Sequence, residues 1–210
     1  QEQLLSLAKW MLAKEYVPRA KGMLQQVIVV KPQAKPSWEA KILLAKLAFD
    51  QRDYAVTKQI ITAILEKMPD HLDAQLLKVR LLLVEEQYEL AKGSLDKIIW
   101  THPKSDEVLV LLAQIYVVQG NRETARIKFK AALKLNPANV QAFLPIYNDL
   151  MAQNDLKYAR ELVINGLRKN PQQVVFLQKL IQINIQEAKW QDAAKVAVEL
   201  AKFPKEKNSA

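Results

Sequence analysis

Apolar residues recur along this chain in short stretches that have the periodicity of an α-helix. Apolar side chains three or four residues apart form one face of a helix, and the stretches come in pairs. A short polar break divides each pair, as in Gln51-Arg52-Asp53 and Gln119-Gly120-Asn121. Breaks of this composition are typical of turns between helices. The pattern therefore predicts an all-α chain made of helix–turn–helix units.

Prolines set the length of the predicted units. Six of the nine prolines are spaced 37, 34, 34, 34 and 33 residues apart, at Pro32, Pro69, Pro103, Pro137, Pro171 and Pro204. Each follows the second helix of a unit, where a residue without an N–H ends the helix. Self-similarity at this period is typical of a solenoid, whose stacked units share one core. We expect a single solenoid over residues 1–206, followed by a polar tail at 207–210. Its six units cover residues 1–34, 38–71, 72–105, 106–139, 140–173 and 174–206.

Aligned units place residues of characteristic size at equivalent positions. One column in the second helix of each unit is small and consists of Ala20, Thr57, Ala91, Ala125, Ala159 and Ala193. Another is large in the first five units and small in the last, with Leu24, Ile61, Leu95, Phe129, Val163 and Ala197. Small positions let another helix pass close by, and large ones fill the space between helices. The columns therefore predict closely packed helices.

The fourth unit resembles a known repeat. It contains Leu109-x2-Leu112-Ala113-x2-Tyr116, then Gly120, Ala125-x3-Phe129, Ala132 and Pro137. This pattern is very similar to the tetratricopeptide repeat, including its length of 34 residues, and the resemblance covers essentially the whole chain. Three residues depart from the pattern. Other units have leucine at the place of Lys78, alanine at the place of Thr57 and tyrosine at the place of Asn184. The resemblance implies a right-handed superhelical solenoid of about six repeats, whose first helices line a concave face.

Local signals predict helix starts and one irregularity. Ser37, Ser105 and Asn139 each precede a first helix, and we expect them to cap it. Gly166 stands in a second helix where the other units carry larger residues. We interpret Gly166 either as drift in one repeat or as a local bend that widens the concave groove.

The residue types needed for catalysis or metal binding do not form a recognisable site. The chain has no cysteine, and its two histidines, His71 and His102, fall in loops between units, so we expect no metal site. No nucleotide-binding or hydrolase motif occurs. No apolar stretch is long enough to span a membrane. We therefore expect a non-catalytic protein with no cofactor, metal or membrane span.

The net charge of +9 does not by itself indicate a nucleic-acid binder. The basic residues are spread along the chain, and the longest basic run is the pair Arg168-Lys169. Nucleic-acid binders usually gather their charge in a patch or stripe, and helical-repeat RNA binders need base-reading side chains in each unit. We expect no nucleic acid among the partners.

The concave face is the predicted binding site. The resemblance places the first helix of each unit along it, and positions seven residues apart share one helical face. One apolar row consists of Leu5, Ile42, Leu76, Val110, Leu144 and Gln178, and a second of Leu12, Phe49, Leu83, Val117, Met151 and Ile185. A polar row of Lys9, Lys46, Arg80, Gln114, Asn148 and Gln182 runs between them. The predicted groove is thus cationic in the first three units and amide-bearing in the last three.

Two apolar rows around a polar one suit a peptide segment of another protein. The apolar rows would take its side chains, the amides would pair with its backbone, and the cations would favour acidic residues. Two other roles stay open, since the cations can pair with Glu39, Asp50 or Asp73, and the apolar rows can pack between helices. We predict a protein-interaction scaffold that uses this groove. The alternative is a structural part of a longer bacterial array in an envelope or polysaccharide-export complex, with homo-oligomers formed through the solenoid ends.

Overall fold

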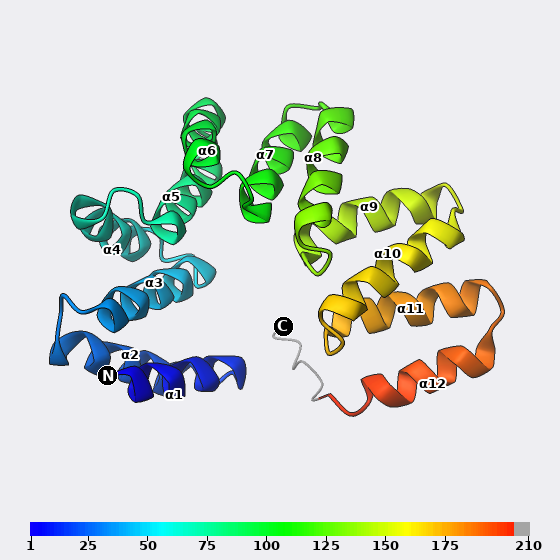
Figure 1. The fold of residues 1–210 in the computed structure, drawn as a ribbon, viewed down its shortest axis with the longest axis horizontal. Coiled ribbons are helices and arrows are strands. Elements are labelled where there is room, and N and C mark those ends of the chain that lie inside the picture. The colour runs from blue at the N-terminus through cyan, green and yellow to red at the C-terminus, as the bar shows by residue number, and fades with distance from the viewer. Residues whose placement is uncertain (204–210) are drawn as a thin grey trace. The chain divides into compact units, whose positions relative to one another are not determined.

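The computed structural model describes residues 1–203, and every element in that range is an α-helix (Figure 1). The twelve helices follow one another as six pairs, each joined by a short turn. They are α1 (Glu2–Ala13) with α2 (Val17–Val30), α3 (Lys35–Asp50) with α4 (Tyr54–Lys67), α5 (Leu72–Val84) with α6 (Tyr88–Thr101), α7 (Asp106–Val118) with α8 (Arg122–Leu135), α9 (Val140–Ala152) with α10 (Leu156–Lys169), and α11 (Val174–Gln186) with α12 (Trp190–Leu200). The predicted all-α fold of six helix pairs is confirmed. Pro204, the end of the sixth predicted unit and the tail at 207–210 lie outside the described residues.

The helices belong to two compact units. The first contains α1–α6, in residues 1–101, and the second begins at His102 and contains α7–α12. Within each unit the two helices of a pair pack together, and the second helix of a pair also packs on the first helix of the next pair. Each pair therefore buries its apolar faces only with the help of its neighbours, as expected for stacked repeats.

Every first helix ends in the same left-handed turn. The second residue after the helix has a φ of 55–61° at Glu15, Arg52, Glu86, Asn154 and Ala188, and Gly120 has a φ of 77° at the equivalent place. Glycine adopts this conformation readily, whereas a residue with a Cβ does so at a cost in free energy. Five of the six turns therefore hold a residue that the packing of the flanking helices must keep in place.

Two of the three predicted helix caps are confirmed. The side chains of Ser105 and Asn139 accept hydrogen bonds from backbone N–H groups three residues on, at 3.4 and 3.0 Å. The prediction for Ser37 is wrong, because α3 begins earlier with Pro36 in its first turn, a position that proline tolerates. Ser37 is instead buried, and its hydroxyl donates to the carbonyl of Lys31 at 2.6 Å. Further caps begin three of the second helices, at Asp53, Asn121 and Asp155.

Gly166 is a packing residue. A Cβ atom on Gly166 of α10 would lie 2.7 Å from the ring of Phe176 in α11, and that ring is fully buried. Three repeats earlier the sizes are reversed, since Ile64 and Ala74 occupy the equivalent places and pack in one cluster. Gly166 therefore leaves the space that Phe176 fills, and this contact replaces drift or a bend as the explanation for the glycine.

Candidate functional site

The two lysines of the polar row in the first unit are exposed and form ion pairs between neighbouring first helices. Lys9 Nζ of α1 lies 2.5 Å from Glu39 Oε1 of α3, and Lys46 Nζ of α3 lies 2.6 Å from Asp73 Oδ1 of α5. All four side chains are 45–46% exposed. Two of the internal pairings that the sequence allowed are thus present. Because exposed ion pairs contribute only about 0–1 kcal/mol, these charges are not needed to hold the helices together and stay accessible to a partner.

Arg80 on α5 differs from the two lysines of this row. It is half-buried, and no carboxylate of the described residues lies within ion-pair distance of it. A guanidinium pairs with a carboxylate through two parallel hydrogen bonds. Arg80 can therefore bind a carboxylate of a partner without first breaking an ion pair with another of the described residues.

The two apolar rows differ in exposure. In the first row, Leu5, Ile42, Leu76 and Val110 are only 1–5% exposed. The prediction that this row lines a groove is wrong for these four residues, because they belong to the packed core. The second row is accessible: Leu12, Phe49, Leu83 and Met151 are half-buried and Val117 is 50% exposed. Within each unit, the candidate surface is therefore an accessible apolar row beside a polar row.

The amide-bearing part of the polar row lies in the second unit. Gln182 Oε1 accepts hydrogen bonds from the Tyr147 hydroxyl at 3.3 Å and from Lys179 Nζ at 3.4 Å. Burial raises the pKa of Tyr147 to about 12, further above neutral pH than the ordinary tyrosine value, and its hydroxyl is a donor. Gln114 is half-buried and Asn148 is exposed, and neither side chain makes such a bond with the described residues. Gln114 and Asn148 thus keep donors and acceptors for a ligand.

The described residues contain neither a metal cluster nor a membrane-spanning helix. In residues 1–203, no group of three or more His, Cys, Asp or Glu side chains is placed to hold a metal ion. No helix in the same range is long and apolar enough to cross a membrane.

Residues 48–115, from the end of α3 into α7, match the family model of the tetratricopeptide repeat. This segment has the sequence of tetratricopeptide repeats. Similar solved structures extend the fold to nearly the whole length. Pseudomonas aeruginosa PilF is 16% identical, with a TM-score of 0.59 over 98% of this chain and 92% of that one. PilW, a widely conserved type IV pilus biogenesis factor, is also 16% identical, with a TM-score of 0.59 over 98% and 94%. A thermophilic tetratricopeptide repeat protein of Thermus thermophilus is 15% identical, with a TM-score of 0.60 over 94% and 98%. No curated protein matches the chain.

Two departures from the tetratricopeptide pattern are buried polar residues whose hydrogen bonds are satisfied. The Thr57 hydroxyl donates to the carbonyl of Asp53 at 2.8 Å. Asn184 is 2% exposed, and its Oδ1 accepts from Arg160 Nη2 at 2.6 Å. Buried polar groups need such partners, so each departure comes with its own compensation.

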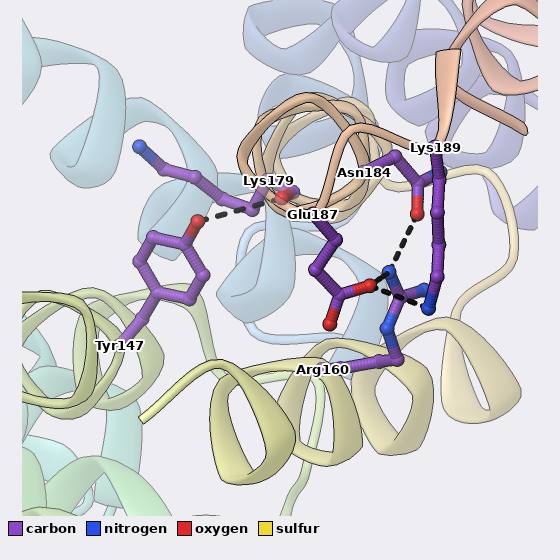
Figure 2. A network of polar contacts seen from close by, with 6 residues as sticks. All are labelled: Tyr147, Arg160, Lys179, Asn184, Glu187 and Lys189. Carbon is purple, nitrogen blue, oxygen red and sulfur yellow. Dashed lines mark hydrogen bonds and ion pairs between the residues drawn. The ribbon is translucent and has the colours of Figure 1, made fainter. Parts of the chain in front are cut away.

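Arg160 is the centre of a charged clamp between α10 and the end of α11 (Figure 2). Its Nη2 also donates to Glu187 Oε2 at 2.6 Å, and Lys189 Nζ lies 2.7 Å from the same oxygen. Hydrogen bonds from Lys189 and from Arg160 lower the pKa of Glu187. The clamp joins the fifth helix pair to the sixth, and we assign it a structural role.

Proposed function

We propose that this tetratricopeptide repeat protein is a non-catalytic scaffold that binds a peptide segment of another protein on its first helices. The observation that supports the proposal most is the pair of accessible rows on α1, α3 and α5. Leu12, Phe49 and Leu83 offer an apolar row on these helices, and the polar row lies one turn before it. An apolar surface beside fixed polar groups is the usual composition of a peptide-binding groove.

The charges of this face favour a segment that contains an acidic residue. Lys9 and Lys46 already face carboxylates of the chain, so their attraction for a further acidic group is reduced. Arg80 has no such neighbour among the described residues and is half-buried, which makes its charge-assisted hydrogen bonds stronger than those of a fully exposed cation. The proposed contact is therefore a carboxylate of the partner on Arg80, with an apolar side chain beside Leu83.

Capture of partners from a lysate of the source cells tests this function. Wild type is compared with the double variant Lys46→Glu/Arg80→Glu, and retained proteins are identified by mass spectrometry. The matched control is Lys58→Glu/Lys97→Glu, which makes the same charge change on second helices of the same unit. Like Lys46, Lys58 forms an exposed ion pair in the wild-type protein, so both variants break one such pair. A partner held by wild type and the control but lost by the first variant supports the proposal. A partner retained equally by all three proteins, each helical by circular dichroism, contradicts it.

A second candidate function is a structural one, in which the protein assembles with further repeats or with other copies. The observation in its favour is the face of α12, where Trp190 and Val198 are 64% and 65% exposed. The similar PilW is described as a pilus biogenesis factor, which is consistent with a role in a large assembly. Concentration-dependent mass in solution would favour this candidate, and a monomer at all concentrations would count against it.

A further inference from the structure

A second groove lies in the second unit, and its lining includes none of the predicted peptide-binding residues. It has a volume of about 790 Å³ and is lined by residues of α8, α9 and α10. The helix α9 packs against both α8 and α10, so the helices that line this groove are neighbours. Leu133, Ile146, Leu150 and Leu162 make its apolar surface.

The helices that line this groove carry opposite charges. Arg126, Lys130 and Lys134 follow one another at four-residue steps on α8, and Asp149 and Glu161 lie on α9 and α10. Arg126 pairs with a glutamate of its own helix at 3.2 Å. In residues 1–203, no ion pair is formed by Lys130, Lys134, Asp149 or Glu161. The groove thus holds separated charges of both signs around an apolar surface.

The first unit contains a smaller equivalent of this groove. A cavity of about 500 Å³ on α4 and α5 is lined by residues that stand two repeats before those of the larger groove. There, buried Leu81 takes the place of Asp149. Lys58 Nζ and Glu85 Oε1 lie 3.6 Å apart across the cavity, whereas Gln153 in the second unit cannot form the matching ion pair. The groove on α8–α10 therefore lacks the buried leucine and the ion pair of its smaller equivalent.

We propose that the groove on α8–α10 binds an amphipathic helix of a partner protein, whose apolar stripe lies between one acidic and one basic edge. Four residues of a helix rise about 6 Å, so acidic residues spaced by four on a bound helix match the spacing of Lys130 and Lys134. The basic edge of the bound helix would face Asp149 and Glu161. A helix bound in the reverse orientation would place like charges against each other and would be repelled. Tyr158, 57% exposed among the lining residues, supplies an aromatic anchor of the kind that dominates helix docking. This groove is independent of the surface proposed on the first helices.

A designed peptide tests the proposal directly. The probe is a fluorescently labelled helical peptide with leucines at heptad positions a and d, glutamate at every e and b, and lysine at every c and g, so that each e and the following b place glutamates four residues apart on one edge. Its binding to the full chain is measured by fluorescence anisotropy. Two control peptides are a scramble without an apolar stripe and a version with glutamate on both edges. We expect the wild-type chain to bind the probe and to bind each control about tenfold more weakly. Absence of probe binding, or equal binding of the controls, overturns the proposal.

Two sets of variants locate the binding site. Lys130→Glu/Lys134→Glu should weaken the probe about tenfold or more and should favour a peptide with lysine on both edges. Asp149→Leu/Gln153→Glu installs the residue types of the smaller groove in the first unit and should abolish binding while the helices remain folded. Lys169→Glu/Lys202→Glu, which makes the same charge change on exposed lysines outside the groove, is the matched control and should bind as wild type does. Probe binding that is unchanged in the first two variants overturns the proposal.

Discussion

Gly166 and Phe176 share one packing site, because a Cβ on the glycine would stand 2.7 Å from the phenylalanine ring. Replacing glycine by alanine inside a helix normally stabilises it by about 0.5–1 kcal/mol. Here we expect Gly166→Ala to lower the free energy of unfolding by about 1–3 kcal/mol, since the buried ring must move. Urea denaturation measures the effect. Gly93→Ala in α6 is the control, because a Cβ there meets nothing within 4 Å, and it should be stabilising.

The second repeat suggests how the site can be repacked. Gly166→Ile/Phe176→Ala would install the residue types of Ile64 and Ala74, so we expect the double variant to be more stable than the sum of its single variants predicts. Such coupling is measured by a double-mutant cycle and reaches about 0.5–3 kcal/mol for residues in contact. Strict additivity of the two single effects would show that the residues do not share a site.

The left-handed turns should respond to glycine in the opposite way. Ala188 has a φ of 56° and Gly120 a φ of 77° at equivalent places. We expect Ala188→Gly to raise the free energy of unfolding by up to about 1 kcal/mol and Gly120→Val to lower it by at least as much, since residues with a Cβ are disfavoured in this region. Thermal unfolding of the two variants checks both signs. A destabilising Ala188→Gly would mean that unfolded-state entropy outweighs the relieved strain.

The Arg160–Glu187 clamp predicts a dependence of stability on pH. The pKa of Glu187 is lowered in the folded chain, so its carboxylate stabilises the fold above the pKa of the unfolded chain, and this contribution is lost as the pH falls through the folded value. We expect Glu187→Gln to cost about 1–2 kcal/mol at neutral pH. The difference from wild type should shrink as the pH falls below about 4. Urea denaturation from pH 7 to pH 3 measures it, and a difference that stays constant would contradict the clamp.

The sequence predicted the helices well because each is a local pattern repeated six times. The proline period, the small column and the polar turns all agree, so errors at single positions did not disturb the fold. Ser37 shows where local rules end. It has the residue type of a cap, but Pro36 starts the helix earlier and Ser37 turns inward.

The candidate site could be predicted only in part. Periodicity identifies which side chains share a helical face, but burial also depends on what the next repeat places against that face. Ile42 and Phe49 share such a face, yet the first is 3% exposed and the second is half-buried. The groove on α8–α10 had a visible signal, since Asp149 breaks a column that holds Leu81 two repeats earlier. Gly166 could not be explained from its own helix, because its partner Phe176 lies on the next one.

Site-specific photo-crosslinking in source cells tests the central claim, that partners bind on the first helices, most directly. A photo-reactive amino acid is placed at Phe49 on the proposed surface, at Tyr158 in the groove on α8–α10, and at exposed Lys97 as a control. The account predicts a discrete crosslinked partner from Phe49 and none from Lys97, whatever Tyr158 captures. Two results would contradict the account. One is that Lys97 gives as many crosslinks as Phe49, and the other is that Phe49 gives no crosslink while Tyr158 captures the partner.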